Sequence, residues 1–163
     1  MQWKAYRIGG NQAFGKKRGI IMNKDMTLSV VKHFDIRFSE VDMMNVVWHG
    51  AYPLYLEDAR EAFGAKFGLS YHRYIEENIF VPIVEMKMNY RHPLRFGMKP
   101  VIRITYRPTD AAKIIFDYEI FDKYTGEVYL TAHSVQVFMD RSYNLLWYSP
   151  DFYTEWKKAM GLI

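Results

Sequence analysis

The sequence predicts a single α+β domain in which an antiparallel sheet wraps around one long helix. One amphipathic helical pattern occurs in the first half of the chain, and four runs rich in β-branched and aromatic residues follow it. The chain has 163 residues, of which 50% are apolar and 25% charged, so it can bury one core but has no room for a second full domain. A mostly apolar helix next to a curved meander packs most economically with the sheet around the helix.

The first strand and the long helix are expected from two different periods. Residues 30–38 alternate in the way a half-buried strand does. From Tyr52, apolar residues recur every three or four positions, which predicts a core-facing helix of about 17 residues. Pro53 suits the first turn, where its missing N–H is not needed, and Gly68 suits the C′ position that ends the helix.

The remaining elements follow from turn signals. Strands are expected over residues 80–90, 100–107, 113–121 and 127–139, and the short connections between the last three favour antiparallel pairing. Residues 70–78 are expected to form a short second helix or a turn, and residues 151–160 a C-terminal helix.

The positive charge of the chain is concentrated at its N-terminus. Residues 1–24 contain six basic residues and no acidic one, whereas the other 139 residues have a net charge of −2. The folded part is therefore close to neutral, which disfavours nucleic acid binding. We expect a poorly ordered basic extension over residues 1–25 and one domain over residues 26–163. With neither a signal-peptide core nor an apolar run of 18 residues, the expected location is the cytoplasm.

Several kinds of site are excluded by residue types. The chain has no cysteine, so it has no disulfide, no cysteine-based zinc site and no thiolate nucleophile. Its five histidines show no metal-ligand spacing, and no metal site is expected. His133 lies in an apolar strand pattern and is expected to be a hydrogen-bonded core histidine.

The loop between the first strand and the long helix holds the main chemical candidates, Asp42 and His49. The first N–H groups of a helix lack intrahelical partners and attract negative charge, so a carboxylate there could act on a carbonyl that these groups polarise. The simpler alternatives are a turn-capping acid at Asp42 and a hydrogen-bonded histidine at His49. Asn45 can occupy a left-handed turn conformation.

The segment DMMNVVWHGAYPLYLEDAR, residues 42–60, resembles the signature of the 4-hydroxybenzoyl-CoA thioesterase family of hotdog-fold proteins. The matching positions are Asp42, Val46, Val47, Trp48, His49, Tyr52, Glu57 and Arg60. The resemblance extends more loosely over residues 30–140. It implies a hotdog fold, a homodimer or homotetramer, and active sites at the subunit interface.

The same resemblance implies hydrolysis of an acyl-CoA thioester without any cofactor, because coenzyme A is part of the substrate. Asp42 corresponds to the catalytic carboxylate, as nucleophile or general base. For His49, the resemblance implies mainly a backbone amide that polarises the carbonyl, and only secondarily a role for its imidazole. Glu57 and Arg60 are expected to form a structural ion pair on the helix.

The resemblance also indicates substrate-binding residues. Val47, Trp48 and Tyr52 would form part of the acyl pocket. Val46, Val47 and Trp48 would also anchor the loop in the core. Arg91, His92 and Lys99 lie in the basic segment YRHPLRFGMK and could contact the phosphates of coenzyme A. The alternative for this segment is a solvated turn between two strands.

The chain departs from the family signature next to Asp42, with Asn45 in place of a glycine and the bulky Met43 and Met44 in place of small residues. These changes concern substrate preference more than chemistry. The rival functions are a hotdog-fold acyl carrier protein (ACP) thioesterase, a dehydratase or hydratase on acyl carrier substrates, and a non-catalytic acyl-ligand binder. Fold alone does not separate them.

Overall fold

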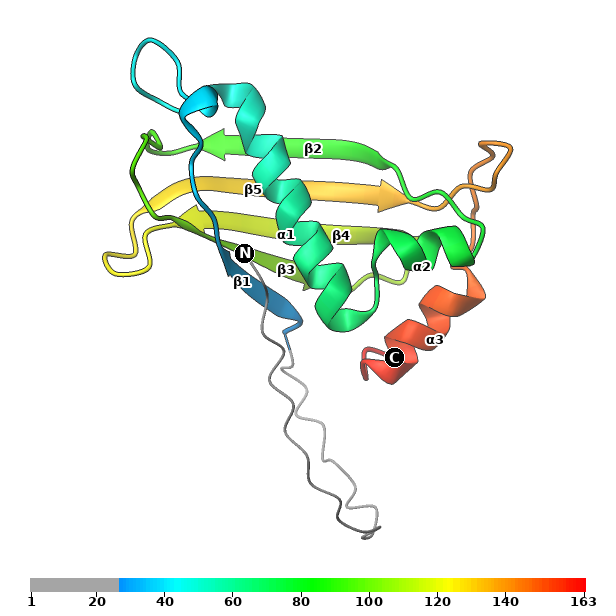
Figure 1. Ribbon diagram of the computed structural model, residues 1–163. Coiled ribbons are helices and arrows are strands. Elements are labelled where there is room, and N and C mark those ends of the chain that lie inside the picture. Colours follow the sequence, from blue (N-terminus) through cyan, green and yellow to red (C-terminus); the bar gives the residue numbers. More distant parts are fainter. Residues whose placement is uncertain (1–26) are drawn as a thin grey trace, which may run out of the picture.

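The structure is a computed structural model that describes residues 27–163, so the expected extension over residues 1–25 lies outside the described residues. Five strands form one sheet in the order β1-β3-β4-β5-β2, and every neighbouring pair is antiparallel (Figure 1). The strands are β1 Ser29–His33, β2 Ile83–Tyr90, β3 Val101–Arg107, β4 Lys113–Phe121 and β5 Val128–Val137. The predicted α+β class and the antiparallel meander are confirmed.

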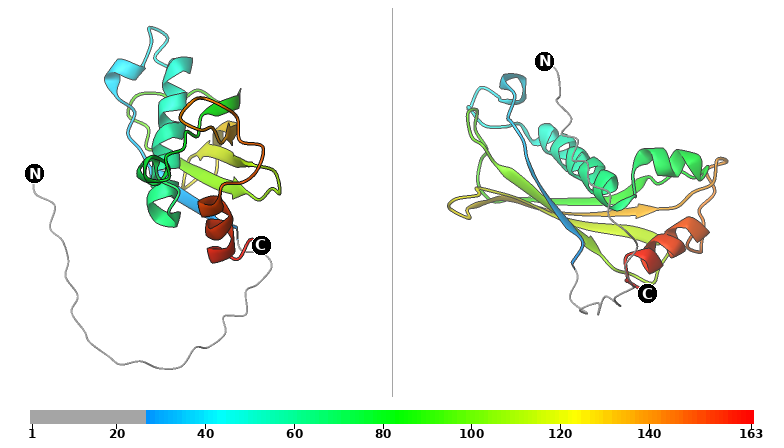
Figure 2. Two further views of the ribbon diagram at one scale, coloured as in Figure 1. Left: turned by 90° about the vertical axis from the view of Figure 1, so that its right-hand side faces the viewer. Right: turned by 60° about the horizontal axis from the view of Figure 1, so that its bottom comes forward.

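The long helix α1, Tyr52–Phe67, lies across one face of the sheet as a second layer (Figure 2). Alternate residues of β4 are buried beneath it, and the Phe63 and Phe116 rings meet edge to face at 4.9 Å. Pro53 lies in the first turn and Gly68 ends the helix with φ 85°, both as predicted. The sheet and α1 thus enclose one continuous apolar core.

Gly64 is an interior glycine of α1 with a packing role. The chain turns back after Gly68 and runs directly against it. A Cβ on Gly64 would lie 2.6 Å from the carbonyl oxygen of Leu69 and 2.8 Å from the Cα of Ser70. Only glycine permits this approach of backbone to helix.

Three strands are shorter than predicted by three or more residues, and one of them is the expected strand over residues 127–139, which extends only from Val128 to Val137. The expected strand over residues 30–38 ends at His33, because its partner β3 begins at Val101, opposite His33, and no ladder continues beyond that pair. The expected strand over residues 80–90 begins at Ile83. Phe80 forms only an isolated bridge to Met139, and Pro82, which has no N–H to donate, follows it.

Short helices complete the fold. Two 3₁₀ turns, η1 Phe38–Glu40 and η2 His49–Ala51, flank the loop before α1. Helix α2, Tyr71–Glu76, and helix α3, Asp151–Ala159, lie at the other end of the sheet. The sequence predicts a short helix or a turn for the first segment and a C-terminal helix for the second. Trp156 of α3 donates from Nε1 to the Phe67 carbonyl at 2.6 Å and so ties α3 to the end of α1. Within residues 27–163, no helix is long and apolar enough to cross a membrane.

The sheet face away from α1 carries charged pairs. Arg103 pairs with Glu119, and Asp117 lies between Arg107 and His133. His133 Nδ1 is 2.7 Å from Asp117 Oδ1, and the His133 side chain is partly exposed. The expectation of a core histidine was therefore wrong. His133 is hydrogen-bonded, but its position in the alternation of β5 places its side chain on the polar face of the sheet.

Candidate active site

The loop before α1 is a small closed hairpin formed by residues 40–48. An isolated antiparallel bridge joins Val41 and Val47, and the Trp48 amide donates to the Glu40 carbonyl at 3.0 Å. At the tip, Asn45 has φ 59°, the left-handed conformation that asparagine tolerates. The tip residues thus have a fixed backbone instead of forming an open loop.

This hairpin orients the Asp42 carboxylate. Its Oδ1 atom accepts hydrogen bonds from the Met44 amide at 2.8 Å and from the Val46 amide at 3.4 Å. Within the described residues, Oδ2 has no hydrogen-bond partner, and the residue is only partly buried. Asp42 therefore has the predicted turn-capping role and still presents one free carboxylate oxygen.

The hairpin leads directly into the start of a helix. Turn η2 begins at His49 and continues into α1, so the two form one helical stretch. Among residues 27–163, the amides of His49 and Gly50 have no backbone acceptor, whereas the Ala51 amide donates to the Trp48 carbonyl at 3.0 Å. Free N–H groups at the positive end of a helix can stabilise an oxyanion.

A pocket of about 290 Å³ lies beside this helix start. It is lined by Val46, Val47, His49, Tyr52, Tyr90, Arg91, His92 and Pro93. The rings of Tyr52 and Tyr90 meet edge to face at 5.0 Å, and the Tyr90 hydroxyl donates to the His49 carbonyl at 3.3 Å. Burial raises the pKa of Tyr52, so its phenol is neutral at physiological pH. The pocket joins an apolar wall to two basic residues at its rim.

The pocket contains five of the eight residues that the sequence indicates for the site: Val47, His49, Tyr52, Arg91 and His92. Asp42 does not line the pocket, but its carboxylate accepts a hydrogen bond from the amide of Val46, and Val46 does line the pocket. Lys99 lies outside the lining, with its Nζ 2.6 Å from Asp35 Oδ1 on the exposed surface.

Trp48 departs from expectation in a different way. Its side chain is 46% exposed, so it does not anchor the loop in the core. Of the three expected anchors, Val47 is buried and Val46 is partly buried. The indole instead lies over Gly50, where a Cβ would come within 2.0 Å of the ring. Trp48 therefore covers the backbone of the helix start.

Two residues of this region were missed in the sequence. Tyr90 ends β2, and its side chain turns toward the helix start, which depends on the pairing of strands far apart in sequence. Glu40 is only 8% exposed, although its charged partner Arg37, 3.9 Å away, is itself exposed, and such burial is unusual for a carboxylate. A signal for Glu40 was its spacing of three from Arg37, typical of a capping arrangement.

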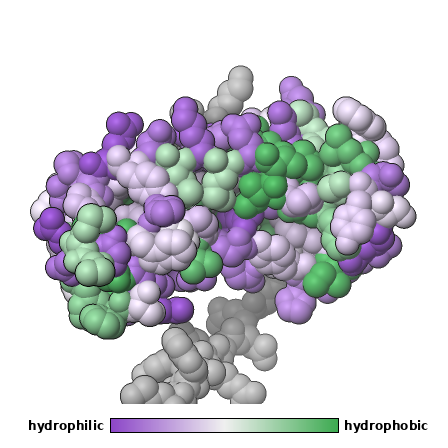
Figure 3. All heavy atoms as spheres, turned by 90° about the horizontal axis from the view of Figure 1, so that it is seen from above, coloured by the Kyte–Doolittle hydropathy of each residue, from purple (hydrophilic) through white to green (hydrophobic). Residues whose placement is uncertain are grey.

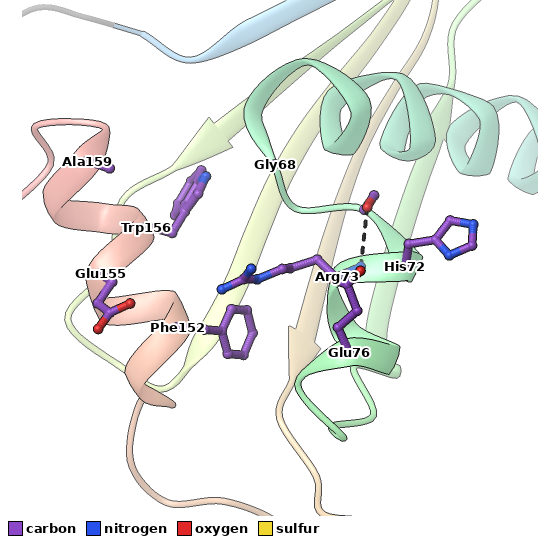
Figure 4. Close-up of a pocket in the computed structure, with 9 residues that line it drawn as sticks. Gly68, His72, Arg73, Glu76, Phe152, Glu155, Trp156 and Ala159 are labelled. Carbon is purple, nitrogen blue, oxygen red and sulfur yellow. Dashed lines mark hydrogen bonds between the residues drawn. The ribbon is translucent and has the colours of Figure 1, made fainter.

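A second, larger pocket of about 460 Å³ lies between α2 and α3 (Figure 4). Arg73 points into it from α2 toward Phe152 and also pairs with Glu77 at 2.6 Å. The pocket is at the C-terminal end of α1, away from the free amides of His49 and Gly50. Its lining includes Glu76 and Glu155 together with Arg73.

Two further sequence predictions concern α1 and metals. Glu57 and Arg60 do form an ion pair on the helix, and the Tyr71 hydroxyl donates to Glu57 as well. These contacts support the structural role predicted for the pair. Within residues 27–163, no group of three or more histidine or acidic side chains could hold a metal ion.

A curved antiparallel sheet around a central long helix is the architecture of the hotdog fold. The chain belongs to the Thioesterase-like superfamily, because the model of this family matches residues 36–156. This match confirms the resemblance carried by residues 42–60.

Individual relatives agree with the family. The chain is 26% identical over 132 residues to YneP of Bacillus subtilis, a candidate acyl-CoA thioesterase, covering 78% of this chain and 95% of YneP. It is 31% identical over 108 residues to the chloroplastic acyl-acyl carrier protein thioesterase ATL3 of Arabidopsis thaliana, covering 66% and 57% of the two chains. The fold is similar to that of the DHNA-CoA thioesterase of Staphylococcus aureus, with a TM-score of 0.71 at 23% identity over 82% and 92% of the chains.

Proposed function

We propose that the protein hydrolyses acyl-CoA thioesters with Asp42 as its catalytic carboxylate. The observation that carries this proposal is the closed hairpin, which orients Asp42 through two amides and leaves Oδ2 free on the segment that runs directly into η2 and α1. Membership in the Thioesterase-like superfamily supports the reaction class, and similarity to YneP supports coenzyme A as the carrier.

The reaction assigns one role to each group. The thioester carbonyl oxygen accepts a hydrogen bond from the His49 amide, which stabilises the negative charge that develops on it. The Asp42 carboxylate then either attacks the carbonyl carbon or removes a proton from an attacking water. In the first route a C–O bond forms, the C–S bond breaks with release of the thiolate, and water hydrolyses the resulting anhydride.

Single-turnover hydrolysis in ¹⁸O-water can identify the anhydride route. Water attack on the anhydride at its Asp42 carbonyl leaves ¹⁸O in the Asp42 side chain, whereas ¹⁸O only in the released acid results both from direct water attack on the thioester and from attack on the acyl carbonyl of the anhydride. Peptide mass spectrometry of residues 38–52 reads the difference.

Arg91 and His92 are proposed to contact the phosphates of coenzyme A. Both are exposed at the rim of the pocket, and their backbone amides donate to the Tyr129 carbonyl at 2.8 and 3.2 Å. Their main chain is therefore fixed. The Arg91 side chain is exposed, and His92 Nδ1 lies 3.8 Å from Glu127 Oε1, with both of these side chains about half exposed. Guanidinium groups pair well with phosphate oxygens.

A dimer formed through β2 would complete the site. β2 is an edge strand that pairs only with β5, so its outer N–H and C=O groups can pair with a second copy. Figure 3 shows apolar surface on the side of the molecule along which β2 runs, and Val84 of β2 is 59% exposed. Because Tyr90 ends β2 and lines the pocket, a partner there would lie beside the pocket. Sedimentation velocity tests this, and a monomer at micromolar concentration would contradict it.

The test of the proposal is thiol release from short, long, branched and aromatic acyl-CoA esters. The chain has no cysteine, so a thiol-reactive dye has no protein background. We expect kcat to fall by about two orders of magnitude or more in Asp42→Asn, as for loss of a catalytic carboxylate. Asp58→Asn, at an exposed position of α1, is the matched control. No release from any ester, or release that is equal in Asp42→Asn, would refute the assignment.

An acyl-acyl carrier protein thioesterase is the second candidate, because similarity to ATL3 favours it. The two carriers share phosphopantetheine, but only coenzyme A has the adenosine phosphates. The same acyl group is therefore assayed on coenzyme A, on pantetheine and on acyl carrier protein. A kcat/KM at least tenfold higher on the carrier protein would favour the second candidate.

A further inference from the structure

The buried carboxylate of Glu40 is the one acidic side chain of the hairpin that the proposed reaction does not use. Its Oε2 atom accepts from the Tyr55 hydroxyl at 2.6 Å and from the Arg37 amide at 2.9 Å. Arg37 Nε is 3.9 Å from Oε1, beyond hydrogen-bond distance. A buried carboxylate costs free energy unless it is well hydrogen-bonded, so its position is strongly constrained by these two donors.

Tyr55 connects this carboxylate to α1. It lies one turn after Tyr52, is 4% exposed, and packs against the Phe34 ring at 4.4 Å. Burial and the hydrogen bond to Glu40 raise the pKa of Tyr55, so its phenol keeps its proton and is the donor. Glu40 is therefore held to the helix by the Tyr55 hydroxyl, which is always the donor in this hydrogen bond, while the Glu40 carboxylate is the acceptor.

The backbone of Glu40 is at the base of the hairpin. Its carbonyl accepts from the Trp48 amide, and the next residue, Val41, bridges to Val47. Asp42 is two residues away on the same hairpin strand. The hydrogen bond from Tyr55 to Glu40 is thus a side-chain contact between the base of the hairpin and α1. It adds to the direct chain connection at Trp48 and to the hydrogen bond from the Val47 amide to the Leu94 carbonyl.

We infer that Glu40, held by Tyr55, is a positioning residue that sets the place of the Asp42 carboxylate relative to the free amides at the start of α1. The inference rests on the proposed function for its effect on turnover. It does not require Glu40 to touch the substrate. A shift of about 1 Å in a catalytic group can cost about 100-fold in rate, so a change at this contact is expected to act on kcat.

The test compares Tyr55→Phe, Glu40→Leu, the double variant and Glu40→Gln. Tyr55→Phe and Glu40→Leu are each expected to lower kcat about tenfold with KM within about twofold, and the double variant to be no worse than the more severe single one. Glu40→Gln keeps an acceptor oxygen for Tyr55 and is expected to retain kcat within about threefold.

Tyr153→Phe is the matched control. Tyr153 is also buried, and its hydroxyl is 2.6 Å from that of Tyr106, but it lies on α3 at the other end of the sheet (Figure 1). The Tyr153 hydroxyl also donates to the Lys113 carbonyl at 3.1 Å, so Tyr153→Phe loses buried hydrogen bonds and should lower the thermal stability at least as much as Tyr55→Phe, with an unchanged kcat. If Tyr55 had only a structural role, Tyr55→Phe would have an unchanged kcat, as Tyr153→Phe has.

A second measurement does not depend on turnover. The Met44 and Val46 amides bind Asp42, so their ¹H–¹⁵N resonances report the geometry of the carboxylate. They should shift in Tyr55→Phe and Glu40→Leu and stay in place in Tyr153→Phe. Unshifted amides in both hairpin variants, or shifted amides with native kcat, would overturn the inference.

The failure of the proposed function has a different signature. If Asp42→Asn has native turnover, or no ester is hydrolysed, the catalytic assignment falls while shifted amides still support the Glu40 contact. If Asp42→Asn is inactive and Tyr55→Phe is fully active, the inference about Glu40 falls alone.

Discussion

Replacement of Gly64 by alanine sets two effects on the stability of α1 against each other. Alanine favours a helix interior over glycine by about 1 kcal/mol, so on propensity alone Gly64→Ala would stabilise the protein. The new Cβ would however lie 2.6 Å from the Leu69 carbonyl oxygen, and this contact must lengthen by about 0.8 Å to reach the ordinary limit of 3.4 Å. The neighbour is backbone and cannot rotate away.

Movement of that backbone would also disturb the contacts around it. Gly68, Leu69 and Ser70 form the turn between α1 and α2, and the neighbouring Phe67 carbonyl accepts the hydrogen bond from Trp156. Overpacking of this kind costs about 1–3 kcal/mol, and we place Gly64→Ala at the upper end because the clash is with main chain. The net expectation is a destabilisation of about 2 kcal/mol, or about 4–8 °C in Tm.

The assay is urea unfolding followed by circular dichroism. Ala65→Gly, at an exposed position of α1, is the control and should cost about 1 kcal/mol through propensity alone. Because Gly64 is far from the helix start, kcat should be unchanged in both variants. A Gly64→Ala protein that is as stable as the native protein, or more stable, would show that the turn adjusts freely and would refute this reasoning.

Three other predictions concern the hairpin, the pocket rim and the charged sheet face. Asn45→Gly should change stability by less than about 0.5 kcal/mol and Asn45→Val should cost about 1–2 kcal/mol in urea unfolding, because φ is 59° there; equal costs would contradict it. Arg91→Ala should raise KM for acyl-CoA about tenfold and more at low salt, with Lys99→Ala unchanged; the reverse order would refute the placement of the two residues. Burial raises the pKa of Asp117, but the hydrogen bonds from His133 and Arg107 lower it by more, so this pKa lies below the ordinary value. Asp117→Asn should therefore be less stable than the native protein by about 0.5 kcal/mol at pH 7, and the difference should vanish as the pH falls below about 4, through the lowered pKa; a difference that persists in acid would disagree.

The elements with a strong local signal were predictable from the sequence. The boundaries of α1 follow from Pro53, the apolar stripe and Gly68, all of which act within the helix itself. The end of β1 was not predictable, because the alternation continues to Phe38 although the partner strand starts only opposite His33. Strand ends depend on a partner about 70 residues away, and no local pattern encodes it.

The candidate site shows the same division. The spacing of Asp42, Asn45 and His49 indicates a turn that leads into a helix, and the structure has this turn with Asn45 at positive φ. The buried Glu40 and the exposed Trp48 were not predictable, since both depend on what packs against them after folding. By residue type alone, a glutamate is expected to be exposed and a tryptophan to be mostly buried.

The closed base of the hairpin has an evolutionary consequence. Because residues 40–48 are joined by their own backbone contacts, side chains at the tip can be exchanged without repacking the interior. Met43 and Met44 are both exposed there, directly after Asp42. Sequence drift at these two positions can therefore change what approaches the carboxylate while the carboxylate keeps its place, so a lineage with this hairpin can diversify its substrates at small thermodynamic risk.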